Sequence, residues 1–141
     1  MNTKKKLRQL VRRCGTNDPF RIARELGIET RYDAPSFLMG FHQYSNRVHI
    51  IHINPDVCYE WQRFTCAHEL GHALLHPKTC TSYLSAHTFF SIERIENEAN
   101  EFAAGLLAYG MEHVEGMTLQ EAAAIYGVPP KYAEHLMKTV L

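Results

Sequence analysis

The sequence contains no long run of apolar residues, which limits where the protein can work. Spanning a bilayer as a helix takes about 20 consecutive apolar residues, and no stretch of the 141-residue chain approaches that length. The N-terminus carries lysines without the apolar segment that follows them in a secretory signal. The sequence therefore predicts a cytoplasmic protein with no membrane partner.

Cysteine is scarce, and its spacing argues against cysteine chemistry. The four cysteines form no C-x-x-C pair, and none has an adjacent histidine in the sequence that could act as its base. Reduced thiols in an intracellular chain are the simplest interpretation. The four residues are Cys14, Cys58, Cys66 and Cys80.

An excess of either charge is also missing. Fifteen basic residues balance fifteen acidic ones, so the chain has no overall electrostatic footprint for nucleic acid or an anionic membrane. The N-terminal segment is the exception, because six cations precede the first acid, Asp18. Leu7, Leu10, Val11 and Cys14 give this segment an apolar helical stripe. We interpret its cations as a solvated helix face, with a patch for an acidic partner as the alternative.

The chain does contain a helical segment with two paired histidines. Residues 63–76 have apolar residues at helical spacing and include the pattern H-E-x-x-H. On a helix, His68 and His72 differ by about 40° around the axis and about 6 Å along it, so both imidazoles reach one Zn²⁺. Glu69 is turned by about 100° from His68. It flanks the ion there, in the position of a general base that takes a proton from the attacking water.

A catalytic zinc needs a third protein ligand, and residues 95–107 offer a candidate. Their apolar positions recur at a spacing of 3.6 residues, which predicts a second helix that faces the core. Glu96 and Asn100 share one face of it, so Glu96 is placed to complete the metal shell. Asn100 is placed to hydrogen-bond the outer nitrogen of a ligating histidine. Glu98 is the rival third ligand, whereas His76 lies too far along the first helix to reach the same ion.

These two segments resemble the ImmA/IrrE family of small bacterial metallopeptidases. The match is strongest over about residues 61–107, which include R-F-T-x-A-H-E-L-G-H and E-x-x-A-N-x-F-A-A-x-L-L. In that family two histidines and the glutamate of the second helix hold the metal, and the glutamate after the first histidine is the base. The resemblance therefore implies metal ligation by His68, His72 and Glu96, with Glu69 as the base. Residues 108–110 depart from the Met-Pro that usually follows, which affects the turn after the second helix.

Residues 28–54 change to a β-rich pattern. Residues 39–44 and 48–53 predict a hairpin around Ser45-Asn46-Arg47, with residues 29–32 as a third strand. Three histidines lie on these strands, but no alternate-residue pair faces an acidic partner, so we predict that they are not ligands. They are His42, His49 and His52.

Helix boundaries follow from capping residues. Asp18-Pro19 predicts a helix that Gly27 ends, and Asn54-Pro55 predicts the cap and first turn of the motif helix, which ends at Pro77. A capping box at 118–121 starts a helix that stops at residue 127, and Pro129-Pro130 starts a last helix through Lys138. The resulting αα-hairpin over 118–139 has few cations, so we do not expect direct nucleic-acid binding.

We therefore expect an α+β fold in which residues 1–141 form one small zincin-like domain. Its helices should pack on a short, mainly antiparallel sheet, with the motif core at 54–108 and the helical hairpin at the C-terminus. A chain of this length can bury about two-thirds of its unfolded surface in one core.

The pattern predicts a zinc-dependent endopeptidase with Zn²⁺ as cofactor. The family resemblance implies the substrate, which would be a helix-turn-helix repressor of a mobile element or stress response whose cleavage relieves transcriptional repression. In the Ser/Thr-rich loop at 78–91, Tyr83 and His87 are candidates to stabilise the oxyanion. Two alternatives stay open: a non-proteolytic zinc-containing regulatory module that docks to a partner, and direct DNA binding.

Overall fold

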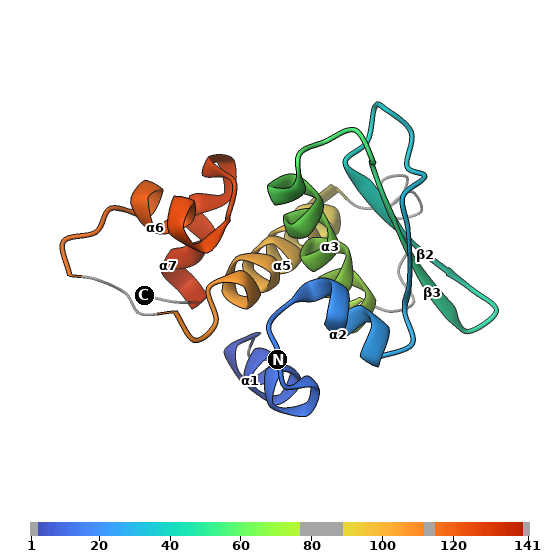
Figure 1. Cartoon of the computed structure of the whole chain (residues 1–141), viewed down its shortest axis with the longest axis horizontal. Coiled ribbons are helices and arrows are strands. Elements are labelled where there is room, and N and C mark those ends of the chain that lie inside the picture. The colour runs from blue at the N-terminus through green and yellow to red at the C-terminus, as the bar shows by residue number, and fades with distance from the viewer. Residues whose placement is uncertain (1–2, 77–88, 112–114, 140–141) are drawn as a thin grey trace.

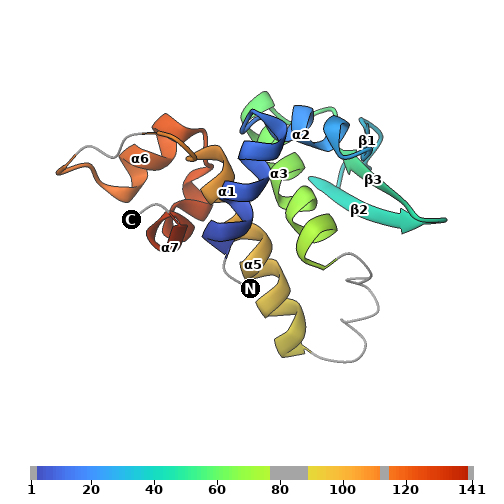
Figure 2. The ribbon, with the colours of Figure 1, turned by 90° about the horizontal axis from the view of Figure 1, so that it is seen from below.

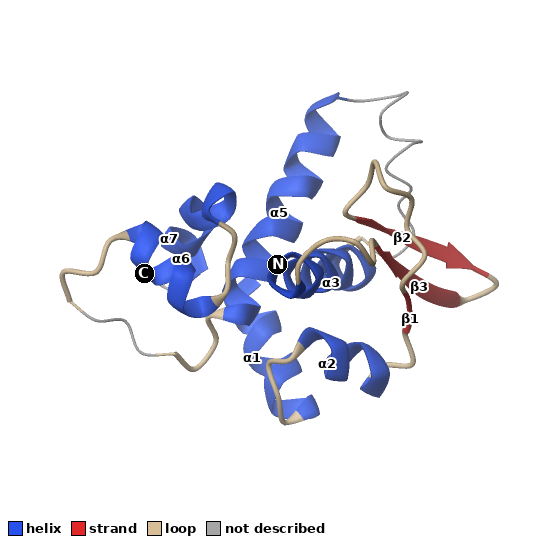
Figure 3. Ribbon diagram, turned by 45° about the horizontal axis from the view of Figure 1, so that its top comes forward, coloured by secondary structure: helices blue, strands red, loops and turns tan. Residues whose placement is uncertain are grey.

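The computed structural model describes residues 3–76, 89–111 and 115–139 and has the predicted α+β class, with helices packed on a small sheet (Figure 1). Two long helices form the centre, the sheet lies on one side of them and the C-terminal helices on the other (Figure 3). The helices are α1 (Thr3–Cys14), α2 (Pro19–Glu25), α3 (Tyr59–Leu75), α5 (Phe89–Leu107), α6 (Leu119–Tyr126), the 3₁₀ helix η1 (Pro130–His135) and α7 (Leu136–Thr139); the strands are β1 (Glu29–Arg31), β2 (Gly40–Ser45) and β3 (Val48–Ile53).

The three predicted strands form a mixed sheet in the order β1-β3-β2. β2 and β3 form an antiparallel hairpin, as predicted, and β1 pairs in parallel with β3. The hairpin turn has positive φ values at Asn46 and Arg47, 52° and 66°, as a two-residue type I′ turn requires. Ile51 and Ile53 point into the core and are fully buried. Strand β2 therefore lies at one edge of the sheet, beside helix α3.

Helices α3 and α5 pack closely where Gly71 of α3 faces Phe102 of α5. A Cβ atom added at Gly71 would lie 3.0 Å from Cδ1 of Phe102, a contact tight enough that the ring of Phe102 would have to shift. Helix α1 lies across α5, with Leu7 buried as its apolar stripe predicts (Figure 2). The largest fully buried side chains of the core include Phe102, Leu7, Ile22, Ile51, Ile53, Leu70, Leu106, Leu107 and Leu136.

The start of α3 was predicted four residues too early. Asn54 does not cap a helix but forms a turn, in which its Oδ1 accepts from the backbone N–H of Asp56 at 2.8 Å. Its Nδ2 donates to the carbonyl of Leu38 at 2.9 Å. Asn54 thus joins the end of β3 to the preceding loop, and α3 begins at Tyr59 with Cys58 as its N-cap.

The shorter helices follow their capping residues. Asp18 caps α2 by accepting from the N–H of Phe20 at 3.1 Å, and Gly27 follows the helix with a φ of 74°. Thr118 and Glu121 form the predicted capping box of α6. None of the helices in the described ranges is long and apolar enough to cross a membrane.

The last predicted α-helix is mostly a 3₁₀ helix. Residues 130–135 form η1, and only Leu136–Thr139 continue as one α-helical turn. In a 3₁₀ helix side chains three residues apart eclipse one another. This spacing aligns Ala133 and Leu136, both buried, on the core side of the C-terminal hairpin.

Candidate metal centre

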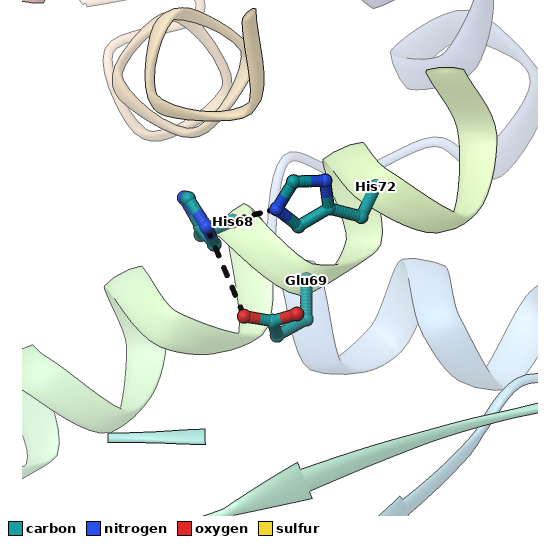
Figure 4. A group of neighbouring side chains, drawn as sticks. All are labelled: His68, Glu69 and His72. Carbon is teal, nitrogen blue, oxygen red and sulfur yellow. Dashed lines mark hydrogen bonds and ion pairs between the residues drawn. The ribbon is translucent and has the colours of Figure 1, made fainter. Parts of the chain in front are cut away.

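Helices α3 and α5 bring three predicted metal ligands to one point. Nε2 of His68 lies 3.0 Å from Oε2 of Glu96, and Nε2 of His72 lies 3.1 Å from Oε1 of the same carboxylate. The two Nε2 atoms are 3.1 Å apart. Figure 4 shows the two imidazoles with these nitrogens facing each other above the carboxylate of Glu69. The three side chains therefore converge from two helices on one small volume.

The spacing of these atoms fits a tetrahedral metal ion. Ligand atoms bound to zinc at about 2.0–2.1 Å lie about 3.4 Å from one another, close to the separations in this cluster. Two imidazole nitrogens and one carboxylate oxygen are also a donor set that catalytic zinc takes. The cluster of His68, His72 and Glu96 is thus chemically and geometrically suited to zinc.

A second carboxylate, that of Glu69, adjoins the same cluster. The possible ligand atoms of His68, Glu69 and His72 all lie within 4.8 Å of one another, so Glu69 competes with Glu96 for the third place. However, Oε2 of Glu69 is 3.8 Å from Nε2 of His68, whereas Glu96 contacts both imidazoles at 3.0 and 3.1 Å. The closer contacts favour Glu96 as the third ligand and leave Glu69 beside the cluster.

Burial sets the protonation behaviour of Glu69. Its side chain is among the few buried charged groups, and this burial raises its pKa, although the charges of His68 and His72 oppose the shift. The neighbouring charge of Glu96 raises the pKa further. A carboxylate with a raised pKa is a better proton acceptor near neutral pH than an exposed one.

The pKa values of His68 and Glu96 shift in opposite directions. Burial favours neutral His68, but the hydrogen bond to Glu96 and the charges of Glu69 and Glu96 outweigh it and raise the pKa of His68. Burial also acts to raise the pKa of Glu96, but hydrogen bonds from His68 and His72 outweigh it and lower that pKa. These contacts therefore favour the protonated form of His68 and the ionised form of Glu96.

Asn100 holds His68 in the orientation that was predicted for it. Nδ1–H of His68 donates to Oδ1 of Asn100 at 2.8 Å, so Nε2 of the same ring faces the cluster. A hydrogen bond to the outer nitrogen of a ligating histidine fixes both its tautomer and its ring orientation.

His76 connects His72, a member of the cluster, to Glu98 outside it. Nδ1 of His76 lies 3.2 Å from Nδ1 of His72, and Nε2–H of His76 donates to Glu98 at 2.9 Å. Glu98 also pairs with Nε of Arg94 at 3.4 Å. His76 is thus a satisfied histidine, and Glu98, the rival third ligand, lies on the outer side of His72.

A pocket of about 170 Å³ adjoins the cluster and was not predicted from the sequence. Trp61 and Phe64 precede His68 by seven and four residues on α3, a helical spacing that could have indicated a shared face. Tyr132 comes from η1, and no local pattern signals its place at the site. The lining residues are Met39, Gly40, Trp61, Phe64, Thr65, His68, Glu69, Glu96, Asn100 and Tyr132.

The strand histidines lie outside the cluster of His68, His72 and Glu96, although one of them contacts an acid. Nδ1 of His52 lies 2.6 Å from Oδ1 of Asp33, and its Nε2 lies 2.8 Å from Oε1 of Gln43. This histidine does face an acid, which follows β1 in the chain. The rings of His42 and His49 stack with their centroids 4.9 Å apart, and burial is the main cause that lowers the pKa of His42 to about 4. Tyr83 and His87, the oxyanion candidates, lie outside the described residues.

Comparison with known proteins places the whole cluster inside one family match. Residues 23–137 match a peptidase family model described as the IrrE N-terminal-like domain. The chain is 33% identical over 132 residues to "Uncharacterized immunity region protein 2" of Bacillus phage phi105, covering 90% of this chain and 84% of that protein. It is 24% identical over 145 residues to "Metallopeptidase ImmA" of Bacillus subtilis (strain 168), covering 97% and 85%.

Proposed function

The chain belongs to the peptidase family of IrrE N-terminal-like domains, and from that premise we propose that it is a zinc-dependent endopeptidase. One observation carries the proposal: the two imidazoles of α3 and the carboxylate of Glu96 on α5 meet at 3.0–3.1 Å beside the buried carboxylate of Glu69. Metallopeptidase function agrees with the ImmA relative.

We propose that His68, His72 and Glu96 hold the metal and that the metal is Zn²⁺. The donor set and its spacing support zinc, and the longer contact of Glu69 supports leaving that side chain out of the ligand set. When bound, zinc supplies a Lewis acid that polarises the substrate carbonyl and lowers the pKa of water.

Glu69 is the general base of the proposed reaction. Its carboxylate accepts a proton from the attacking water and then passes that proton to the nitrogen of the leaving amine. Burial supports this role because the raised pKa allows the carboxyl group to hold the proton between the two transfers. Asn100 is a positioning residue, since it touches His68 and not the reacting atoms.

For the substrate we propose a helix-turn-helix repressor of a mobile element or stress response, cut so that repression is relieved. The names of the two relatives, an immunity region protein of a phage and ImmA, support this assignment. Because a bacterial repressor works on DNA in the cytoplasm, we place the peptidase there too. We also propose that residues 1–141 form one metallopeptidase domain, since one hydrophobic cluster includes side chains from α1 to α7.

The direct test incubates the zinc-loaded protein with the repressor-like product of the adjacent gene, next to a Glu69→Gln variant, and weighs the products by mass spectrometry. Loss of the base should lower the cleavage rate by about 10²–10⁴-fold, while the metal content of both proteins stays equal. One cut, made only by the wild type, is the expected result.

Other outcomes separate the alternatives. Cleavage by Glu69→Gln at the wild-type rate would reject Glu69 as the base. An intact repressor that binds both proteins would instead favour a docking module whose metal has no catalytic role. Glu96→Ala provides the matched ligand variant, and we expect it to lose metal as well as activity.

A further inference from the structure

The pocket beside the metal cluster has walls from three parts of the chain. Met39 precedes the edge strand β2, Trp61 and Phe64 lie on α3, and Tyr132 lies on η1 of the C-terminal hairpin. The lining also includes residues of the cluster, among them Glu69. A group bound in this pocket therefore lies next to the proposed base and metal ligands.

The aromatic wall of the pocket is well fixed. The rings of Phe64 and Tyr132 stack with centroids 4.6 Å apart and planes 11° apart, and Trp61 meets Tyr132 edge-on at 5.9 Å. Such contacts add to the stability that burial of the rings provides. The wall is preorganised, so a ligand does not have to order it on binding.

The size of the pocket limits what it can hold. A cavity of about 150 Å³ lined by apolar side chains binds benzene, and this pocket measures about 170 Å³. Pockets for drug-sized ligands are about 300–1,000 Å³. The space therefore suits a single six-membered ring or a branched aliphatic group.

The chemistry of the walls favours an apolar occupant. Outside the cluster, the lining side chains are uncharged, and three of them are aromatic. Away from Glu69 and Glu96, a charged side chain would lose its hydration here without a wall residue to pair with it. An acidic one would in addition be repelled by the carboxylate of Glu69.

We propose that this pocket binds one apolar side chain, aromatic or branched aliphatic, of the substrate residue next to the bond that is cut. Trp61 and Tyr132 are then specificity-determining residues, one supplied by the motif helix and one by the C-terminal hairpin. This assignment rests on the proposed endopeptidase function, because such a subsite has a role only beside a scissile bond.

The first arm of the test measures cleavage. A library of synthetic peptides with one randomised position on each side of a central bond is treated with the zinc-loaded protein, and the products are read by mass spectrometry. We expect cuts beside Phe, Leu or Met on one fixed side of the bond, with kcat/KM about 10- to 100-fold above that of the alanine peptide.

Variants assign this preference to the pocket. Trp61→Ala should remove most of the preference for the phenylalanine peptide over the alanine peptide, mainly through KM. Tyr132→Phe keeps the ring and should keep the preference, and Tyr132→Ala should lose it. Tyr59→Ala is the matched control, because it removes an exposed ring from the same helix outside the pocket.

The second arm measures binding without catalysis. Trp61 is the one tryptophan of the chain, so its fluorescence reports directly on the pocket wall. We expect N-acetylphenylalanine amide to change the emission of the metal-free wild type saturably, at lower concentrations than N-acetylaspartate amide or N-acetyllysine amide.

The two arms separate the two proposals. Cleavage with no side-chain preference, or with a preference for basic residues that Trp61→Ala leaves unchanged, would overturn the pocket assignment and leave the peptidase standing. A saturable response to the phenylalanine amide with no peptide cut would overturn the peptidase and leave the ligand class of the pocket standing. No response and no preference for apolar residues would overturn the assignment even if Trp61→Ala failed to fold.

Discussion

The two ring nitrogens of His68 have different partners, so the role of Asn100 in orienting this ring can be tested by mutation. Nε2 faces the cluster and Nδ1–H donates to Asn100 at 2.8 Å. Asn100→Ala should lower zinc affinity by about 10- to 100-fold, the usual cost of losing an outer partner of a metal ligand. Competition with a zinc-binding dye measures it.

Asn97→Ala is the matched control, because Asn97 is an exposed residue of the same helix. It should leave zinc affinity within about twofold of the wild type. Equal affinities for the Asn100 and Asn97 variants would show that Asn100 does not position His68.

His42 makes the stability of the metal-free protein dependent on pH. Burial, together with the charges of His49 and His72, lowers the pKa of His42 from 6.5 to about 4. Between about pH 6.5 and 4 the unfolded chain therefore binds more protons at this residue than the folded chain. The free energy of unfolding should fall as the pH falls through that window and level off below it.

The variant His42→Gln should reduce the fall in the free energy of unfolding between pH 7 and pH 5 by about 1 kcal/mol. The full linkage of about 1.4 kcal/mol per pH unit does not apply, since the ring is partly exposed to water. Urea unfolding of the metal-free proteins at pH 7 and pH 5 measures the difference, and measurements at pH 7 and 8 serve as the control. Equal slopes between pH 7 and 5 for both proteins would contradict the role of His42.

Individual site residues could be predicted where one helix fixes their spacing. His68 and His72 are one turn apart on any α-helix, and Glu96 and Asn100 likewise, so the pattern places each pair on one face. Contacts between elements lie beyond such patterns. Asp33 reaches His52 from a loop 19 residues earlier in the chain, and this contact depends on how β1 pairs with β3.

At the scale of elements, the site depends on how closely α3 and α5 pack. A methyl group at Gly71 would lie 3.0 Å from Cδ1 and 3.3 Å from Cβ of Phe102. Gly71→Ala should therefore lower the free energy of unfolding by about 1–3 kcal/mol, the usual cost of overpacking. It should also weaken zinc binding, since the ligands come from both helices. Urea unfolding and dye competition measure the two effects.

A second substitution tests whether the contact with Phe102 is the cause. Phe102→Leu makes room beside the new methyl group, so the double variant should lose less stability than the two single changes added together. Additive losses would mean that Gly71→Ala acts elsewhere, for example on the helix backbone.

Element types could be predicted from the sequence better than their boundaries. The hairpin and the capping box at Thr118 each rest on neighbouring residues, and both were confirmed. The helix start at Asn54 was predicted wrongly because an N-cap and an isolated turn show the same hydrogen bond. In both, the backbone N–H two residues later donates to the side chain. Only the contact of Asn54 with Leu38 decides between them.

At the scale of the whole molecule, metal binding should stabilise the fold. An ion that binds only the folded chain adds about 2.7 kcal/mol to the free energy of unfolding at a free concentration 100 times its Kd. For a chain of this length that corresponds to a rise in Tm of about 5–10 °C. Thermal unfolding with and without zinc measures it.

Glu96→Gln should lose this shift, because the variant lacks the carboxylate that contacts both imidazoles. Magnesium should give little shift, since it prefers oxygen ligands in octahedral geometry. A zinc-induced rise in Tm of equal size in the wild type and Glu96→Gln would place the ion elsewhere.

The α+β class could be predicted, but the position of the C-terminal hairpin could not. Capping signals place α6, yet nothing in the sequence shows that η1 packs against α5. In that position Tyr132 of η1 stacks on Phe64 of α3, a contact between residues that are far apart in the chain. The pocket beside the metal cluster escaped prediction for this reason.

The contribution of Tyr132 to the pocket also sets an order of assembly during synthesis. A ribosome adds about 5–20 residues per second, so Tyr132 is made roughly 5–20 s after Met39, which also lines the pocket. The ribosome adds Tyr132 after His68, His72 and Glu96. A nascent chain therefore contains its complete set of proposed zinc ligands before it contains Tyr132, the last residue of the proposed specificity pocket to be synthesised.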